Sequence, residues 1–276
     1  MLEVYEPFKE KCNIEKFTFN GSKYGSTWNE IIVYRNTPKD VEDTSKLPCI
    51  IFFHGSAFMF FDSTMFQGET CKMALLNNCV VYNMDYRKAP EAKAPDYIKD
   101  SYAGVKWVLE EQKGFYDPSR VCLHGSSAGG HMIIGVAMEM AKRDECAQIK
   151  LLIPHIAAMS AVWLDYTPES PELNWVQQGN YRGHVEIYKM MHNDWETAFQ
   201  TKDPDLFPGD MPEDLLKKVP PMYLTTAEWD HYTLDNRFLA ERLKSVGKLL
   251  GLFIEPGQSH GDIPHEEIAK IVRHYL

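Results

Sequence analysis

Residues 121–134 read Val-Cys-Leu-His-Gly-Ser-Ser-Ala-Gly-Gly-His-Met-Ile-Ile, and this stretch decides the fold class. A short apolar run, a turn of small residues and an apolar helix-like run follow one another without a linker. The turn fits the Gly-x-Ser-x-Gly nucleophile elbow, in which a sharp strand-to-helix turn lifts one serine hydroxyl above a sheet. That serine is Ser127. The other interpretation is a glycine-rich connection between a strand and a helix that carries no chemistry.

Strand-like and helix-like segments alternate on both sides of this stretch. Apolar or β-branched runs typical of strands occur at residues 15–20, 28–34, 47–53, 79–84, 149–154, 221–226 and 249–255. Apolar residues recur at helical spacing over residues 67–76, 96–111, 128–140, 235–246 and 263–275. The first two strands favour an antiparallel edge. The repeated strand-helix-strand units predict an α/β fold with a mostly parallel sheet and helices on both faces.

Size and composition favour one enzyme-sized domain. The chain has 276 residues, 44% of them hydrophobic, and we expect residues 1–276 to form a single domain with a large core. The formal charge of −10 argues against a nucleic acid or an anionic membrane as partner, because both select basic surfaces. A homodimer is compatible with the sequence.

The six cysteines and the lengths of the apolar segments indicate where in the cell the protein is expected. The cysteines form no Cys-x-x-Cys pair, and Cys49 and Cys122 fall inside predicted strands, where a thiol acts as a small hydrophobe. We expect mostly free thiols. No apolar window is long enough for a membrane span, and the first residues lack the pattern of a secretory leader. A cytoplasmic protein is therefore the expectation.

A serine hydroxyl is a poor nucleophile unless an imidazole takes its proton and a carboxylate orients that imidazole. His260 lies among small residues after the last predicted strand, so it is the candidate base, whereas His265 and His274 are expected at the surface of the last helix. Asp230 follows the strand at residues 221–226 and is the candidate acid. Glu228 and Asp235 are its rivals, with Asp235 expected to cap a helix beginning at Asn236.

The negative charge that develops on the substrate carbonyl oxygen needs backbone N–H donors. The elbow would supply one from Ala128, and the small residues Gly55 and Ser56, after the strand at 47–53, would supply others. His54 is expected to hold that loop by hydrogen bonds. No metal or organic cofactor is required by this chemistry.

Residues 157–218 interrupt the alternation of strands and helices. The segment is rich in tryptophan, tyrosine and proline and shows no clear strand, so we interpret it as an insertion that covers a pocket beyond the strand ends. A packed helical excursion without ligand contact is the alternative. Residues 1–15 are either a frayed terminus or a short helix over the pocket entrance. The candidate pocket residues are Phe58, Trp163, Trp175 and Tyr181.

Three motifs together resemble the hormone-sensitive lipase group of α/β-hydrolases, from about residue 47 to the C-terminus. The family's HGGG loop corresponds to residues 54–57, its DYRLAPE stretch to residues 85–91 and its GDSAGG elbow to residues 125–130. Its acid motif is similar to the segment that begins at Asp230. The resemblance implies the α/β-hydrolase fold, with about eight strands, a small helical cap and a Ser127, Asp230 and His260 triad.

The chain departs from that family pattern at the turns. Ser56 and Ala57 replace two glycines of the HGGG loop, and Ser126 replaces the usual aspartate of the elbow. The N-terminal cap is shorter than in that family, so residues 157–218 would provide most of any lid. A smaller cap favours short to medium acyl esters over long lipids as substrates.

The expected function is a serine carboxylesterase that works through an acyl-enzyme on a small-molecule ester. Gly130-His131 also resembles acetyl-esterase and formamidase relatives, so a carbohydrate ester or amide hydrolase is an alternative. A ligand receptor on the same fold is the non-enzymatic alternative, although His260 is retained.

Overall fold

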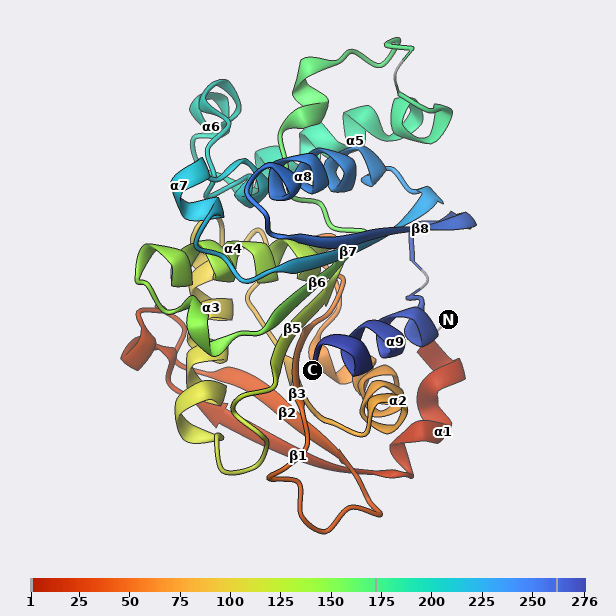
Figure 1. The fold of residues 1–276 in the computed structure, drawn as a ribbon. Coiled ribbons are helices and arrows are strands. Elements are labelled where there is room, and N and C mark those ends of the chain that lie inside the picture. Colours follow the sequence, from red (N-terminus) through yellow and green to blue (C-terminus); the bar gives the residue numbers. More distant parts are fainter. Residues whose placement is uncertain (1, 172, 262) are drawn as a thin grey trace.

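The centre of the protein is an eight-stranded sheet (Figure 1). The structure is a computed structural model that describes residues 2–171, 173–261 and 263–276. The strand order is β1-β2-β4-β3-β5-β6-β7-β8. The strands are β1 (Cys12–Phe19), β2 (Ile31–Pro38), β3 (Cys49–Phe53), β4 (Val80–Met84), β5 (Val121–Ser126), β6 (Leu151–His155), β7 (Met222–Trp229) and β8 (Leu249–Ser259).

The sheet is antiparallel at one edge and parallel elsewhere. β2 pairs antiparallel with both β1 and β4, and the remaining neighbours pair parallel. The α/β fold predicted from the sequence, including the antiparallel edge, is confirmed. Since parallel strands end at the same edge of a sheet, the residues that follow β3, β5, β6, β7 and β8 lie along one rim.

Helices cover both faces of the sheet, and the side chains of β3 alternate between them. Ile50 and Phe52 belong to a buried cluster with α2 (Gln67–Asn77) and α9 (His265–Tyr275). Ile51 and Phe53 belong to the larger cluster on the opposite face. The helices on that opposite face are α3 (Asp96–Glu111), α4 (Ala128–Lys142) and α8 (Thr233–Ser245). Burial on both faces explains why the strand sequences are continuously apolar.

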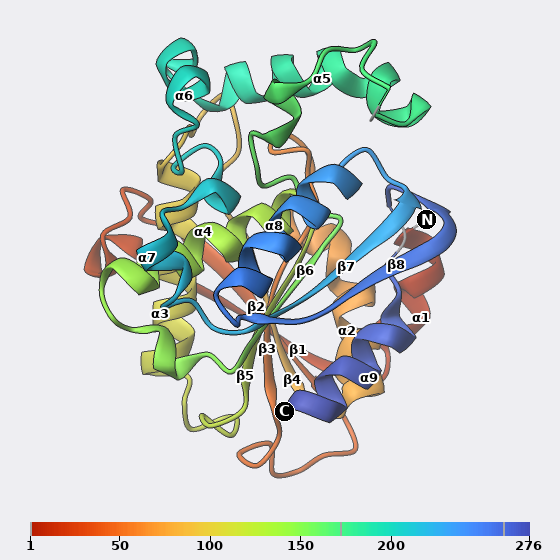
Figure 2. The same ribbon diagram turned by 45° about the horizontal axis from the view of Figure 1, so that its top comes forward.

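Residues 157–218 form a helical excursion in which the structure describes no strand. Its helices are the 3-10 helix η5 (Val162–Asp165), α5 (Trp175–Met191), α6 (Trp195–Thr201), the 3-10 helix η6 (Pro208–Asp210) and α7 (Glu213–Leu216). In two views, α5 and α6 lie at the periphery, beyond α8 and away from the sheet (Figures 1 and 2). The N-terminal segment instead forms the 3-10 helix η1 (Leu2–Tyr5) and α1 (Glu6–Lys9), which pack against α2.

Two histidines of α9 differ in their exposure. His274 is exposed, as expected, but the surface position expected for His265 is wrong, because its side chain is buried beside Tyr5 with ring centroids 5.4 Å apart. Burial lowers the pKa of His265 to about 3, so the ring is neutral at pH 7. It therefore packs as an aromatic residue rather than as a surface base.

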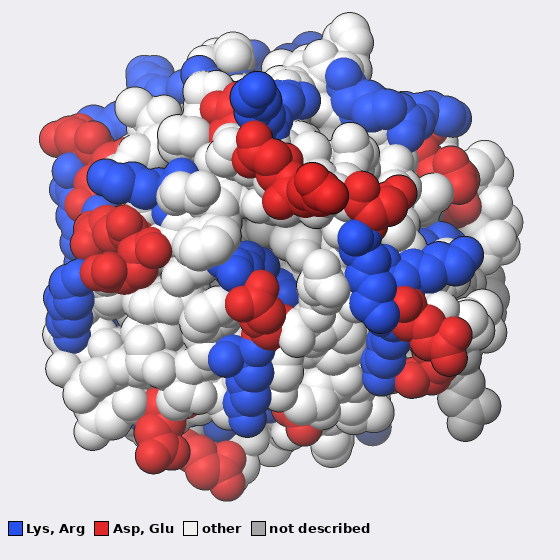
Figure 3. Space-filling view, turned by 90° about the horizontal axis from the view of Figure 1, so that it is seen from below, with Lys and Arg blue, Asp and Glu red and all other residues white. Residues whose placement is uncertain are grey.

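The surface carries charges of both signs. On the face drawn in Figure 3, lysine and arginine side chains alternate with aspartate and glutamate, so this face lacks the continuous basic patch that a nucleic acid backbone selects. All six cysteines are free thiols. Within the described parts of the chain, no helix combines the length and the apolar character that a bilayer crossing requires.

Candidate active site

Ser127 occupies the turn between β5 and α4. Its backbone has φ 55° and ψ −117°, a left-handed conformation that a residue with a side chain rarely adopts. The Ser127 N–H donates to the carbonyl oxygen of His155 at 2.9 Å, and the His131 N–H donates to the Ser127 carbonyl oxygen at 3.2 Å. The strand and the helix thus fix the strained turn, which directs the hydroxyl away from the sheet.

The glycines of the elbow are required by close contacts with neighbouring atoms. A Cβ atom at Gly125 would overlap the carbonyl oxygen of Gly129, and one at Gly129 would overlap the carbonyl oxygen of Phe53 at the end of β3. Gly130 faces the side chain of Ala157 at 2.5 Å from the position of a Cβ. The glycines therefore let the start of α4 approach both β3 and β5.

We expect Gly129→Ala to destabilise the protein by about 3 kcal/mol or more, because the added methyl group meets rigid backbone. Urea unfolding followed by tryptophan fluorescence would measure the change in the free energy of unfolding. Gly183→Ala is the matched control, because Gly183 lies in α5 and, apart from its chain neighbours and the backbone of its own helix, no described atom lies within 4 Å of its Cβ position. It should stabilise the helix by about 0.5–1 kcal/mol. Equal effects of the two variants would contradict the packing argument.

Three side chains from distant parts of the chain form a line of hydrogen bonds. His260 Nε2 lies 3.0 Å from Ser127 Oγ, and His260 Nδ1 lies 2.7 Å from Asp230 Oδ2. Ser127 follows β5, Asp230 follows β7 and His260 follows β8, so the common rim of the sheet brings them together. The structure thus places the three candidate residues within reach of proton transfer.

Asp230 is held as a buried carboxylate. Asp230 is 0% exposed, and its Oδ1 accepts a 2.6 Å hydrogen bond from the Tyr232 N–H. Burial raises the pKa of Asp230, but the hydrogen bond and charge of His260, together with His231 and the Tyr232 N–H, outweigh it and hold the pKa below its ordinary value. The carboxylate therefore stays charged at neutral pH and accepts a hydrogen bond from the N–H of His260 Nδ1.

The two rival acids, Glu228 and Asp235, form hydrogen bonds with backbone N–H groups away from His260. Glu228 accepts a hydrogen bond from the Gly257 N–H at 2.8 Å, at the exposed end of β7. Asp235 lies inside α8, which begins at Thr233, so the expectation that it caps a helix starting at Asn236 is wrong. Its Oδ1 accepts from the N–H groups of Met159 and Ser160 at 3.2 and 3.0 Å. Asp235 thereby fixes the loop that follows β6.

The loop after β3 is held beside the elbow by the residues of the DYR stretch. The Tyr86 hydroxyl lies 2.7 Å from the His54 carbonyl oxygen and 2.9 Å from Ser56 Oγ, and its ring stacks on the His54 ring at 4.9 Å. His54 Nε2 lies 3.6 Å from Asp85 Oδ1. Burial raises the pKa of Asp85, but His54 and the Lys88 ammonium lower it to about 2. His54 thus positions the loop, as expected.

This loop carries backbone N–H groups to the serine. A Cβ added at Gly55 would lie 3.5 Å from Ser127 Cβ, so the backbone of the loop runs close beside the elbow. In the described chain, the N–H groups of Gly55, Ser56 and Ala128 donate to no protein acceptor. Ser56 Oγ instead accepts from the Phe58 N–H at 2.9 Å and helps to shape the turn.

Ser127 and His260 open into a cavity of about 690 Å³, a size suited to a small organic ligand. Its walls come from η1, the β3 loop, α2, the elbow and the segments after β6 and β8. The lining residues are Tyr5, Gly55, Ser56, Ala57, Phe61, Phe66, Glu69, Ser126, Ser127, Ile156, His260, Gly261 and Ile263. Sequence reasoning did not single out Tyr5, Phe66, Glu69 or Ile156, which come from three separate segments of the chain.

None of the four candidate pocket residues lies among the described residues that line this cavity. Phe58 is packed in the core, edge to face against His131 at 4.9 Å. Trp163 stacks on Tyr188 at 5.5 Å and contacts Tyr181 at 5.8 Å, so the Trp163 and Tyr181 rings pack within the helical excursion. Trp175 is 72% exposed and lines a second cavity, of about 460 Å³, which borders His260.

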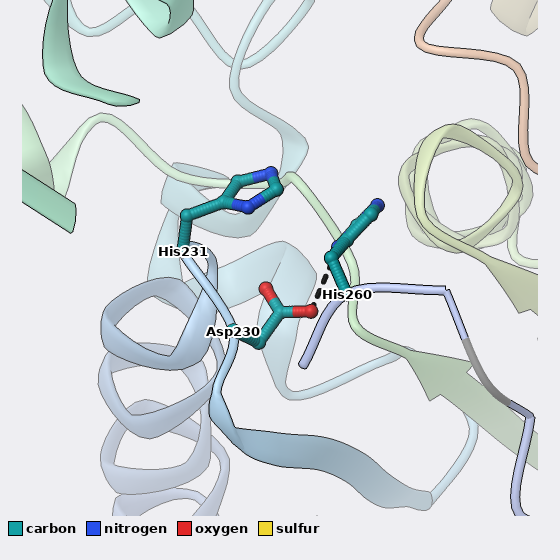
Figure 4. A group of neighbouring side chains, drawn as sticks. All are labelled: Asp230, His231 and His260. Carbon is teal, nitrogen blue, oxygen red and sulfur yellow. Dashed lines mark hydrogen bonds and ion pairs between the residues drawn. The ribbon is translucent and has the colours of Figure 1, made fainter. Parts of the chain in front are cut away.

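His231 lies next to Asp230 and His260 (Figure 4). The ligand atoms of Asp230, His231 and His260 lie within 4.8 Å of one another, a set that Zn²⁺ accepts in proteins. Burial is the main cause that lowers the pKa of His231 to about 4, and the charge of His260 adds to it. The His231 ring is therefore neutral at pH 7. A metal held by Asp230 and His260 Nδ1 would replace the hydrogen bond that orients the His260 ring, so metal binding would compete with the use of His260 as a base.

Comparison with known proteins finds curated carboxylesterases among the relatives of the chain. Probable carboxylesterase 8 of Arabidopsis thaliana is 27% identical over 122 residues, which cover 39% of this chain and 37% of the relative. Carboxylesterase NlhH of Mycobacterium tuberculosis is 27% identical over 219 residues, which cover 78% of this chain and 66% of the relative. The chain therefore spans less than two thirds of the length of either relative.

The fold is shared with solved esterases, and a family match covers most of the chain. The carboxylesterase EstE1, cloned from a metagenomic library, superposes with a TM-score of 0.80 at 20% identity, over 99% of this chain and 95% of EstE1. At that identity the likeness concerns the fold. The alpha/beta hydrolase fold family matches residues 50–263. The chain therefore belongs to the α/β-hydrolase fold family, as its resemblance to the hormone-sensitive lipase group implied.

Proposed function

We propose that the protein is a serine carboxylesterase that hydrolyses short to medium acyl esters of small molecules. The observation that carries the proposal is the line of hydrogen bonds from Ser127 through His260 to Asp230, at the wall of a cavity of about 690 Å³. The similarity to curated carboxylesterases supports it.

In the first half of the reaction, Ser127 Oγ bonds to the ester carbonyl carbon and its proton passes to His260 Nε2. The charge that develops on the carbonyl oxygen is stabilised by the free N–H groups of Gly55, Ser56 and Ala128. Asp230 holds the His260 ring and stabilises its protonated form. The bond to the alcohol then breaks, and the alcohol leaves with the proton from His260.

The second half repeats these steps with water. His260 Nε2 takes a proton from water while the water oxygen bonds to the acyl carbon of the acyl-enzyme. The bond to Ser127 Oγ breaks, Oγ recovers the proton from His260, and the carboxylic acid is released. The residues of this chain are sufficient for every step.

A fluorophosphonate probe tests the proposal directly, because it reacts with an activated serine. We expect labelling of the folded protein at Ser127 alone, located by peptide mass spectrometry, and hydrolysis of p-nitrophenyl acetate that stops in proportion to the labelling. A ligand receptor with an inactive triad would bind ligands but not react. The proposed esterase function would be refuted if the probe labelled another serine. It would also be refuted if the protein neither reacted with the probe nor hydrolysed the ester.

The alternative hydrolases from the sequence depend on Gly130-His131. His131 is fully buried, and its Nδ1 lies 2.8 Å from the Ala158 carbonyl oxygen, which indicates a structural role. Parallel assays with acetylated xylan and N-formylkynurenine accompany the ester assay. We expect both to be hydrolysed more slowly than p-nitrophenyl acetate.

The volume of the cavity limits the acyl chain. We expect kcat/KM for p-nitrophenyl esters to be highest for acyl chains of about four to eight carbons and to fall steeply beyond them, because a cavity of about 690 Å³ holds a ligand of moderate size. A series from acetate to palmitate measures this, with a long-chain triglyceride as the extreme. A preference for the triglyceride would contradict the proposed access.

Other features of the proposal concern architecture and location. We infer that the chain is one domain in which residues 1–15 and 157–218 act as cap elements, with Tyr5 and Trp175 as their contributions beside His260. Free thiols at all six cysteines are compatible with the cytoplasm. Size-exclusion chromatography with light scattering would distinguish a monomer from a homodimer.

A further inference from the structure

One acidic side chain in the wall of the main cavity has no function in the mechanism above. Glu69 lies in the first turn of α2 and is 4% exposed, yet it lines the same cavity as Ser127 and His260. Its Oε1 is buried and makes no hydrogen bond, and no described residue forms an ion pair with the carboxyl group within 4.0 Å. Buried carboxyl groups are nearly always paired, so Glu69 lacks a partner that a ligand could supply.

The ammonium of Lys72, the cation that affects Glu69, contacts the Tyr5 ring and forms no ion pair with Glu69. Lys72 lies one turn further along α2, and its ammonium lies 5.1 Å from the centroid of the Tyr5 ring. It lines a neighbouring cavity with His265 and Glu266, not the one that contains Ser127. Burial raises the pKa of Glu69 and the charge of Lys72 lowers it in part, which leaves the pKa at about 8. The carboxyl group is therefore poised to ionise when a cation approaches.

The walls around Glu69 suit a cation more than a neutral group. Phe61 and Phe66 line the same cavity, and aromatic rings attract ammonium groups through their faces. Tyr5 also lines it, but its ring is already in contact with the Lys72 ammonium. Among the described lining residues, Glu69 is the sole acid and none is a lysine or arginine. The net charge of −10 also favours the approach of a cation.

We propose that Glu69 is a specificity residue that binds a positively charged amine carried by the ester substrate, with Phe61 and Phe66 beside it. This inference rests on the proposed esterase function and narrows its substrate class to esters of cationic alcohols or acids. The amine makes a charge-assisted hydrogen bond or a cation–aromatic contact, while Ser127 attacks the ester carbonyl in the same cavity.

Two pairs of isosteric esters test the proposal on each side of the ester bond. Butyrylcholine and 3,3-dimethylbutyl butyrate differ by a nitrogen cation in place of a carbon in the alcohol. Phenyl 6-aminohexanoate and phenyl heptanoate differ by an ammonium in place of a methyl group in the acid. For each pair, the measured quantity is the ratio of kcat/KM for the cationic ester to kcat/KM for the neutral ester.

We expect Glu69→Gln to lower this ratio by about tenfold or more in at least one pair, because it keeps the shape of the side chain but removes its charge. Hydrolysis of the neutral esters should change by less than about threefold, which also shows that the variant is folded. Glu266→Gln is the matched control: it removes the same charge from the exposed start of α9, beside the neighbouring cavity, and should leave the ratio unchanged.

A second measurement needs no variant. Hexylammonium and 1-hexanol are compared as competitive inhibitors of neutral ester hydrolysis by the wild-type protein, and hexylammonium should bind about tenfold more tightly. Equal inhibition, or ratios that do not change in Glu69→Gln for either ester pair, would overturn the role of Glu69 while neutral esters are still hydrolysed. If the wild-type protein hydrolyses no ester at all, the proposed esterase function itself fails.

Discussion

Ser127→Ala is expected to lower kcat/KM for p-nitrophenyl acetate by about four to six orders of magnitude. The variant keeps the cavity and the backbone N–H donors but removes the oxygen that attacks the ester, and residues of a triad act as a unit. Initial rates over a range of ester concentrations measure the loss. The expected residual activity is the small amount that the N–H donors and binding alone can provide.

The adjacent serine is the matched control for this experiment. Ser126 ends β5 and lines the same cavity, but His260 bonds to Ser127 Oγ and not to Ser126. Ser126→Ala should therefore keep most of the activity and all of the fluorophosphonate labelling. If Ser126→Ala is inactive and Ser127→Ala is active, the nucleophile has been assigned to the wrong residue of the elbow.

Asp230→Asn should reduce kcat by about 10⁴-fold with little change in the thermal midpoint of unfolding. The amide keeps the shape and can still accept from the Tyr232 N–H, but its NH₂ group favours the tautomer of His260 that carries a proton on Nε2. That proton prevents His260 from accepting the proton of Ser127. Stopped-flow or steady-state kinetics at pH 7–8 would measure the effect.

The two rival acids provide the controls for the role of Asp230. Glu228→Gln keeps the acceptor for the Gly257 N–H, and Asp235→Asn keeps an oxygen for the N–H groups of Met159 and Ser160. Both variants should retain kcat within about tenfold of the wild-type value, because neither side chain contacts His260. A loss at Glu228 or Asp235 that equals the loss at Asp230 would contradict the assignment.

Much of the fold could be predicted because local and global patterns agree in the strands. Residues 49–53 are apolar at every position, and the structure buries them between two layers of helices. The turn at Ser127 was recognisable because two contacts with backbone atoms and one with a side chain demand glycine at fixed positions. The three candidate triad residues could be selected by one rule, namely that each follows a parallel strand and so reaches the same rim.

The lining of the cavity could not be predicted, because it is assembled from segments whose relative placement is a tertiary property. Tyr5, Glu69 and Ile156 come from the N-terminal segment, α2 and the loop after β6, and no sequence spacing connects them. Aromatic residues were chosen from residues 157–218 on composition alone, but most of those rings pack against one another. The role of Asp235 was missed because its partners, Met159 and Ser160, lie about 75 residues earlier.

The position of β8 at the end of the sheet has a consequence for how the protein loses activity. His260 follows an edge strand that pairs with β7 alone, whereas Ser127 follows β5 in the centre of the sheet. Edge elements open locally at lower free energy than central ones. In mild denaturant, ester hydrolysis should therefore decline while most of the tryptophan fluorescence and far-ultraviolet circular dichroism signal persists. The loss of activity would then report local unfolding of β8 before the cooperative unfolding of the whole molecule.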